Sequence, residues 1–180
     1  LSLHDALPIS LRRFAKSEIV PSNKDRFLRK ETLQGFVHDE ASAFFGGLAG
    51  NAGLFSTARD VARVYQMLLN GGEIDGQRYL SKETCQLFTT ETSKISRRGL
   101  GFDKPDADDP KKGNCAPAAP AEVYGHTGFT GTCAWVDPVN ELVYVFLSNR
   151  IYPDVTNRKL NQLHIRERIQ GAIYDAMKKK

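Results

Sequence analysis

One short stretch of the chain combines residue types that can do chemistry. Residues 125–132 read GHTGFTGT, in which three glycines and three threonines surround a single histidine. Apolar runs flank the stretch, so the pattern predicts a sharp turn between two buried strands. His126 can donate a hydrogen bond or carry a proton near neutral pH. The hydroxyl of Thr127 can donate to a carboxylate or to a carbonyl oxygen.

The next two residues of this stretch suggest how a substrate could be held. Gly128 has no β-carbon, so an extended substrate could lie along the edge of the strand and pair with it. The backbone N–H of Phe129 could then donate to an oxyanion, an interaction that contributes roughly 3 kcal/mol in enzymes that use it. The spacing is equally typical of a glycine-rich hairpin turn with a surface histidine, and both interpretations stay open.

The surrounding sequence predicts a sheet that would position these residues. Strands are expected over residues 122–126 and 132–136, and the continuously apolar residues 142–147 suit a central strand covered on both faces. Before them, residues 98–102 predict a short strand. Residues 103–120, with many prolines and charges, predict an exposed loop.

Helices are expected before and after these strands along the chain. Thr57 is expected to begin a helix that Gly71 ends, and Ser81 is expected to cap a second helix that runs to about Thr89. The expected buried face of the first helix consists of Val61, Val64, Tyr65, Leu68 and Leu69. The expected apolar face of a C-terminal helix consists of Leu160, Leu163, Ile169, Ile173 and Met177. This order predicts an α+β fold, in which an antiparallel sheet is flanked by helices.

Composition excludes several classes of function. The net charge of +4 comes without a basic stripe interleaved with aromatic residues, so we expect no nucleic-acid partner. Cys85, Cys115 and Cys133 form no C-x-x-C pair, which argues against a zinc site and against a disulfide scaffold. We expect these cysteines to be small buried or loop residues. We also expect no metal and no cofactor.

The first nine residues do not match the rest of the chain. LSLHDALPI resembles one translated reading frame of a sequencing adapter, and such segments are left out of fold reasoning. We therefore expect residues 1–9 to be an artefact and residues 10–180 to be the C-terminal portion of one domain. An ordinary amphipathic start is the alternative. His4 and Asp5 are accordingly not assigned to a site.

Two longer stretches carry a family resemblance. Residues 125–153, GHTGFTGTCAWVDPVNELVYVFLSNRIYP, resemble the third conserved motif and following strands of the serine β-lactamase and penicillin-binding-protein superfamily, and within it the class C-type hydrolases and esterases. Residues 35–72 are similar to another recurrent stretch of that group. The resemblance implies a partial serine β-lactamase/DD-peptidase-like fold and an acyl-enzyme mechanism. It implies that His126, Thr127 and Gly128 bind substrate and that the Phe129 amide forms half of an oxyanion hole.

The chain departs from the pattern of that superfamily in three ways. It contains neither a Ser-x-x-Lys motif nor a Tyr-x-Asn motif, both of which precede this region in the family. We therefore expect the nucleophile to lie upstream and residues 10–180 alone to be inactive. His126 stands where the family motif has a lysine, so a permanent positive charge is absent. The substrate therefore stays open: it could be an ester, an amide or a β-lactam, and either a small molecule or a peptidoglycan-like compound. A non-catalytic binding or accessory module of the same fold is the alternative.

Four further residues are possible pocket residues. His38 and Asp39 are adjacent in VHDE, where a buried loop pair is the alternative role. Asn149 and Arg150 follow the last predicted strand, and the planar fork of Arg150 could bind a carboxylate. A solvated strand end is the alternative for these two. The C-terminal tail resembles a bacterial subgroup in which a glycoside hydrolase domain can lie upstream in the same chain, and a periplasmic or exported protein is expected from the family.

Overall fold

The computed structural model describes most of the chain and divides it into two compact units. The described residues are 19–22, 25, 27–90, 95–109 and 112–178. The first unit comprises residues 1–57 and 149–158, and the second unit comprises residues 58–148 and 159–180. The second unit contains the GHTGFTGT stretch and the strands around it.

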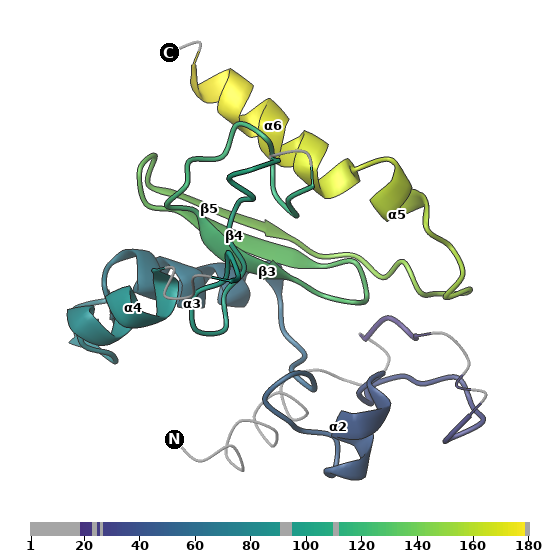
Figure 1. The fold of residues 1–180 in the computed structure, drawn as a ribbon. Coiled ribbons are helices and arrows are strands. Elements are labelled where there is room, and N and C mark those ends of the chain that lie inside the picture. Colours follow the sequence, from purple (N-terminus) through teal and green to yellow (C-terminus); the bar gives the residue numbers. More distant parts are fainter. Residues whose placement is uncertain (1–18, 23–24, 26, 91–94, 110–111, 179–180) are drawn as a thin grey trace. The chain divides into compact units, whose positions relative to one another are not determined.

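An antiparallel three-stranded sheet forms the centre of the second unit (Figure 1). Its strands are β3 (Tyr124–Thr127), β4 (Cys133–Asp137) and β5 (Leu142–Phe146), in the order β3-β4-β5. The predicted α+β class and all three strands are confirmed. In the sheet that the described residues form, the predicted centre is wrong, because β4 is wholly buried and central while β5 lies beside it at an edge. An apolar run indicates that a strand is covered, but it does not indicate how many neighbours pair with it.

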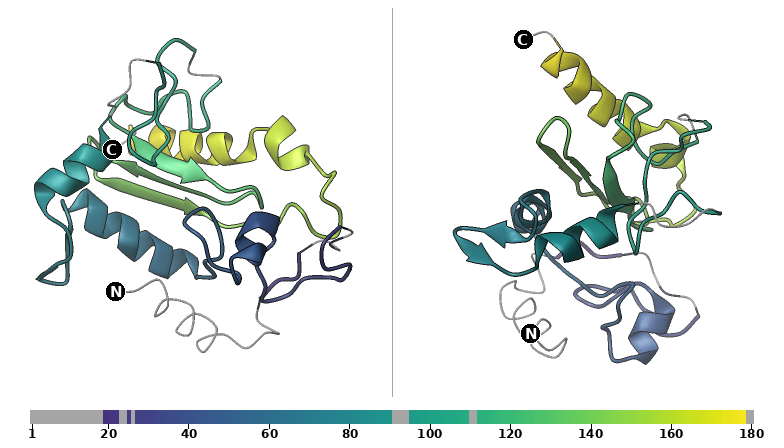
Figure 2. Two further views of the ribbon diagram at one scale, coloured as in Figure 1. Left: turned by 60° about the horizontal axis from the view of Figure 1, so that its bottom comes forward. Right: turned by 60° about the vertical axis from the view of Figure 1, so that its left-hand side comes forward.

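Helices cover the two faces of this sheet (Figure 2). On one face Trp135 packs in a buried cluster with Cys133 and Tyr144, and Ile173 from the C-terminal helix packs against that cluster. Side chains alternate along a strand, so Tyr124 and His126 belong to the opposite face. There the Phe102 ring lies 5.3 Å from the ring of Tyr124.

Helix α3 (Ala58–Leu69) contacts β4 and β5 on that opposite face. Its predicted start after Thr57 is confirmed, and so is its end. The N–H of Gly71 donates to the Leu68 carbonyl at 3.0 Å and that of Gly72 to the Met67 carbonyl at 2.8 Å, with both glycines at positive φ. The predicted buried face is met only in part, since Val61, Tyr65, Leu68 and Leu69 are half-buried while Val64 is 54% exposed. Periodicity identifies an apolar face but not what covers it.

A hairpin and a second helix follow α3. Strands β1 (Glu73–Ile74) and β2 (Gln77–Arg78) pair around a turn at Asp75 and Gly76, a hairpin that was not predicted. Helix α4 (Lys82–Thr89) begins as predicted. Its N-cap is Ser81, whose hydroxyl accepts a hydrogen bond from the Thr84 amide at 3.1 Å.

The predictions for residues 98–120 are wrong in two respects. Residues 98–102 form no strand in the described chain, because Gly101 has a φ of 95° that interrupts extended backbone. A single bridge forms one residue later, between Asp103 and Gly125. The described residues 103–109 and 112–120 are irregular as predicted but not exposed throughout, since Asp103, Lys104 and Cys115 are buried. Hydrogen bonds to these polar groups make their burial possible.

The C-terminal helix is split and buries polar residues beside Tyr174, while Ile173 is partly buried against the core. Helices α5 (Lys159–Gln162) and α6 (Ile165–Met177) are separated at His164, which has a left-handed φ of 48°. Buried Gln170 accepts a hydrogen bond from the Ala116 amide at 2.8 Å. Several of the predicted core residues are exposed instead: Leu163, Ile169 and Met177. The helix thus meets the sheet through specific hydrogen bonds as well as apolar contact.

The described residues of the first unit are mostly irregular. Its helix α2 (Glu40–Phe44) was not predicted. A tight glycine-rich loop follows, and a β-carbon on Gly53 would lie 2.3 Å from the Gly47 carbonyl oxygen. All three cysteines of the chain are buried and form no disulfide, as expected. No helix among the described residues is long and apolar enough to span a membrane.

Candidate active-site strand

The structure places His126 and Thr127 at the end of β3, where the strand enters the glycine-rich turn. His126 pairs with Ala134 and Thr127 pairs with Cys133 on β4. The turn is held by two backbone hydrogen bonds, from Gly128 N–H to the Thr132 carbonyl at 2.8 Å and from Gly131 N–H to the Gly128 carbonyl at 2.9 Å. The position of the motif is therefore fixed by the hairpin itself.

The hairpin gives a structural reason for a glycine at position 128. A β-carbon at Gly128 would lie 2.3 Å from the hydroxyl oxygen of Thr132, and its next neighbour would be 3.7 Å away. The hydroxyl can rotate away, so the restriction is mild. The predicted approach of a substrate to this position is not excluded by the contact and stays a prediction. Phe129 follows with its side chain 63% exposed.

The side chain of His126 is exposed and contacts its own strand. Its Nδ1 atom lies 2.7 Å from the Thr127 carbonyl oxygen. A carbonyl accepts hydrogen bonds, so this contact requires a proton on Nδ1. In the neutral ring Nε2 is then an acceptor, and Nε2 becomes a donor when the ring carries both protons. His126 can therefore donate to an anionic substrate group from Nε2 in its cationic form.

The outer edge of β3 is covered at Gly125 by Asp103. The Asp103 N–H donates to the Gly125 carbonyl at 2.7 Å, and the Gly125 N–H donates to the Asp103 carbonyl at 3.0 Å. Gly125 also faces Trp135 on β4. The Asp103 backbone thus forms a one-residue continuation of the sheet beside the residue that precedes His126.

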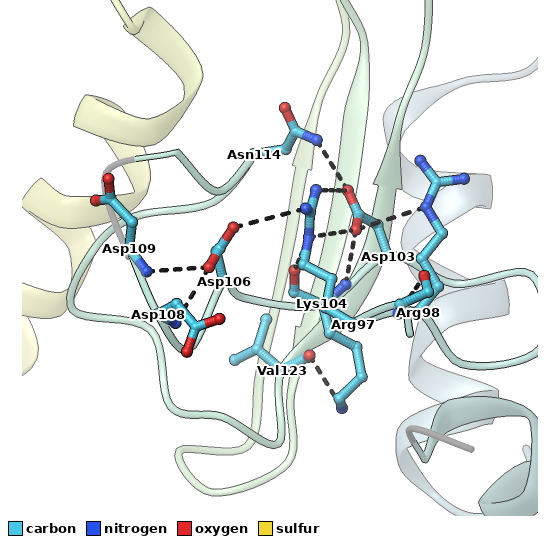
Figure 3. A network of polar contacts seen from close by, with 10 residues as sticks. Arg97, Arg98, Asp103, Lys104, Asp106, Asp108, Asp109, Asn114 and Val123 are labelled. Carbon is cyan, nitrogen blue, oxygen red and sulfur yellow. Dashed lines mark hydrogen bonds and ion pairs between the residues drawn. The ribbon is translucent and has the colours of Figure 1, made fainter. Parts of the chain in front are cut away.

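The carboxylate of Asp103 is 1% exposed and is surrounded by N–H donors (Figure 3). Arg97 contacts both of its oxygens, through Nε at 2.9 Å and Nη2 at 3.2 Å, and Asn114 donates to Oδ2 at 2.8 Å. Burial alone would raise the pKa of Asp103, but the hydrogen bonds from Asn114 and Arg97 outweigh it and hold the pKa below its usual value. Asp103 is therefore an ionised, fully paired anchor.

Lys104 attaches the same loop to the segment that leads into β3. Its Nζ atom lies 3.2 Å from the Thr89 carbonyl oxygen, 3.3 Å from that of Glu122 and 3.4 Å from that of Val123. The lysine is 8% exposed. A buried ammonium group is tolerated when such acceptors replace its water shell. Asp103 and Lys104 together tie residues 97–104 to the strand that carries the motif.

In the first unit, His38 and Asp39 lie at the start of α2. The Asp39 carboxylate caps the helix, accepting a hydrogen bond from the Ser42 amide at 2.7 Å, and this bond lowers its pKa. His38 is half-buried. Burial and the nearby Arg29 guanidinium lower the pKa of His38, so the ring favours its neutral form. These contacts give Asp39 a structural role and leave the predicted pocket role of the pair untested.

Asn149 and Arg150 also make local contacts in the first unit. The Asn149 amide donates to the Pro21 carbonyl at 2.7 Å. The Arg150 guanidinium donates to the carbonyls of Val155 and Asn157, both at 3.3 Å. Arg150 thus stabilises its own loop. Its binding of a carboxylate stays a prediction.

Sequence reasoning missed Asp103, Arg97, Lys104 and Asn114. The available signal was weak: an Asp-Lys pair that directly follows the apolar residues of RGLGF. Charged residues in a proline-rich segment predict exposure. The contacts that bury Asp103 and Lys104 are made by Arg97, by Asn114 and by backbone carbonyls of other segments, and the charges alone do not indicate them. Within the described residues, no cluster of three or more His, Cys, Asp or Glu side chains is arranged to hold a metal ion.

Comparison with known proteins is consistent with this geometry. A family model described as Beta-lactamase matches residues 12–167. Relatives from Escherichia coli (strain K12), Salmonella agona (strain SL483) and Salmonella typhi are each 37% identical to the chain over 135 residues. Each bears the name "Putative D-alanyl-D-alanine carboxypeptidase".

The matched region covers 74% of this chain but 31% of each relative, so the chain matches about a third of the length of these relatives. The family model, by contrast, covers most of the chain and includes the whole of the β3–β4–β5 sheet. The chain therefore belongs to the Beta-lactamase family, within the serine β-lactamase and penicillin-binding-protein superfamily that residues 125–153 resemble.

Proposed function

We propose that the complete protein is a serine hydrolase that forms an acyl-enzyme with substrates ending in a carboxylate, of the D-alanyl-D-alanine kind. The observation that carries the proposal is the placement of His126 and Thr127. They end a strand whose turn is fixed by internal hydrogen bonds, while the imidazole of His126 stays exposed. The names borne by the relatives support the choice of substrate.

Each residue of the motif has a proposed role in this reaction. His126, in its cationic form, and the hydroxyl of Thr127 bind the terminal carboxylate of the substrate. The Phe129 amide donates to the oxyanion that develops on the scissile carbonyl. Gly128 keeps the turn compact between these two groups, because a β-carbon there would crowd Thr132.

The proposed chemistry has two steps. A serine hydroxyl attacks the scissile carbonyl carbon, the C–N bond breaks, and the departing amine takes a proton. Water then attacks the acyl ester and returns the serine. The 180 residues contain no Ser-x-x-Lys motif, so the proposal requires the activated serine to come from another part of the protein.

Substitution of His126 in the complete protein tests the proposed carboxylate binding. The substrate is an N-acylated peptide ending in D-Ala-D-Ala, and the measurement is the rate of release of free D-alanine. We expect His126→Ala to lower kcat/KM on the order of 100-fold, as loss of a hydrogen bond to a charged group would. We expect His126→Lys to recover much of that loss, because it restores a positive charge.

His164→Asn is the matched control, because His164 is also exposed but lies between α5 and α6 with a left-handed backbone that asparagine tolerates. This variant should keep wild-type kcat/KM. An unchanged kcat/KM in His126→Ala would overturn the assignment. A non-catalytic binding module would instead bind the peptide and release no D-alanine from any variant, the wild type included.

A further inference from the structure

Arg166 is a buried arginine in the first turn of α6, and the proposed reaction gives it no role. Its Nη1 atom donates to the Thr132 carbonyl at 3.4 Å, and its Nη2 atom donates to the side-chain oxygen of Asn161 at 3.2 Å. The carboxylate of Glu167 lies 3.8 Å from Nη2, which is too far for a hydrogen bond. These two hydrogen bonds of Arg166 therefore go to a backbone carbonyl and to an amide oxygen, and not to the neighbouring carboxylate.

The Thr132 carbonyl is also the group that closes the glycine-rich turn. It accepts a hydrogen bond from the Gly128 N–H at 2.8 Å, and the Gly128 carbonyl accepts one from the Gly131 N–H at 2.9 Å. A carbonyl oxygen has two lone pairs, so that of Thr132 can accept from Gly128 and from Arg166 together. Phe129 lies inside the turn that these bonds close. Arg166 therefore contacts the carbonyl on which the position of the Phe129 N–H depends.

Phe129 depends on this contact more than the two motif residues of β3 do. His126 and Thr127 are paired with residues of β4 in the antiparallel ladder, and Thr127 is the last residue of β3 in it. Phe129 lies beyond that last pair. Loss of the Arg166 guanidinium would therefore shift the Phe129 amide, while the ladder keeps His126 and Thr127 in place.

The first turn of α6 is itself attached to the sheet, so the guanidinium extends from a fixed backbone. The hydroxyl of buried Tyr144, on β5, donates to the Arg166 carbonyl at 3.1 Å. Tyr144 in turn packs in the buried cluster with Cys133 and Trp135. A charged donor makes a stronger hydrogen bond than a neutral one, and burial removes the water that would compete for it. The contact of Arg166 with Thr132 is therefore suited to hold the turn.

We infer that Arg166 is a positioning residue, which fixes the Thr132 carbonyl so that the Phe129 N–H is presented to the oxyanion. This inference rests on the proposed function, because the role of the Phe129 amide comes from it. An oxyanion donor acts in the transition state, whereas the substrate carboxylate is bound by other groups. Loss of Arg166 should therefore slow bond cleavage and leave substrate affinity nearly unchanged. A merely structural residue would lower the fraction of folded protein and leave the rate constant of that fraction as it was.

Single-turnover kinetics of the complete protein separates cleavage from binding. The substrate is an N-acylated peptide ending in D-Ala-D-Ala, the protein is in excess, and the rate constant of D-alanine release is measured over a range of protein concentrations. Arg166→Met keeps an apolar stem and removes the guanidinium. We expect its saturating rate constant to fall about 10-fold, less than complete loss of an oxyanion donor would cause. The protein concentration at half-saturation should change less than about 2-fold.

Two further variants assign the effect to the contact with Thr132. Arg166→Lys should recover part of the rate, because an ammonium group can also donate to that carbonyl. Arg168→Met is the matched control, since Arg168 lies two residues further along α6 and is exposed. It should keep the wild-type rate constant. Thermal unfolding of each variant establishes whether it folds.

If Arg166→Met does not fold, Asn161→Ala replaces it. Asn161 is exposed, and its removal leaves Nη2 of Arg166 without the Asn161 acceptor, so the rate constant of D-alanine release should fall without a change in half-saturation. A folded variant, Arg166→Met or its replacement, that keeps the wild-type rate constant or loses only affinity would overturn the inference and leave the proposed function intact. An equal loss of rate in Arg168→Met would also overturn it. A folded wild type that releases no D-alanine would overturn the proposed function, and the inference with it.

Discussion

Gly125→Ala tests whether close packing of β3 against β4 positions the motif. The added β-carbon would lie 2.1 Å from the Ala134 carbonyl oxygen, 2.7 Å from Cε3 of Trp135 and 2.8 Å from its Cα. Two of these atoms belong to the backbone of the central strand, so neither can rotate away. The two strands would have to separate locally by about 1 Å to reach ordinary contact distances.

The expected cost follows from that geometry. Overpacking a well-packed site costs about 1–3 kcal/mol, and the rigid neighbours place this substitution at the upper end. We therefore expect the free energy of unfolding, measured by urea denaturation of the complete protein, to fall by about 3 kcal/mol. Because His126 directly follows Gly125, release of D-alanine from the peptide substrate should fall as well.

Gly128→Ala is the matched control in the same hairpin. Its β-carbon would meet a rotatable hydroxyl, that of Thr132, and nothing else within 3.7 Å. We expect this substitution to cost less than about 1 kcal/mol, and less still when Thr132→Ala removes the hydroxyl. An unchanged unfolding free energy in Gly125→Ala would refute the account of how β3 is packed.

Two further predictions concern the anchors of the second unit. Tyr174→Phe removes the hydrogen bond from the Tyr174 hydroxyl to buried Asp137 at 2.8 Å. We expect the free energy of unfolding, measured by urea denaturation, to fall by about 1.5 kcal/mol. An unchanged free energy of unfolding would mean that α6 is not anchored there. The folded pKa of Asp103 is depressed, so its stabilising contribution should be complete above the unfolded pKa of about 4 and lost as the pH falls through the folded pKa. The stability gap between wild type and Asp103→Asn should accordingly be large at pH 7 and shrink below about pH 4, whereas a gap independent of pH would contradict the ionised state of Asp103.

Local signals in the sequence were sufficient for several elements of the fold. Ser81 caps α4, and Gly71 and Gly72 end α3, because capping depends on a few adjacent residues. The hairpin turn at Asp75 and Gly76 carries an Asp-Gly signal of the same local kind. The β3–β4 hairpin was likewise predictable from two apolar runs around glycines.

Features set by distant contacts were not predictable in this way. The central position of β4 depends on which strands pair, and a run of apolar residues in β5 does not encode that. The buried face of α6 includes Gln170, since its partner is the backbone of Ala116, 54 residues earlier in the chain. Asp103 is not predictable either, because its backbone pairs with Gly125 across an irregular loop and its sequence carries no strand signal. The motif itself was predictable from composition, whereas the segment that closes its edge was not.

Covalent trapping tests the central claim most directly. The complete protein is incubated with penicillin and its intact mass is then measured. The account predicts a single mass increase equal to one penicillin molecule, mapped by peptide analysis to a serine followed by Lys three residues later. It also predicts that adduct formation is slower in His126→Ala than in wild type. The contradicting result is a folded wild-type protein that gains no mass with penicillin and releases no D-alanine from the peptide. It would refute the claim that this chain belongs to a serine hydrolase acting through an acyl-enzyme.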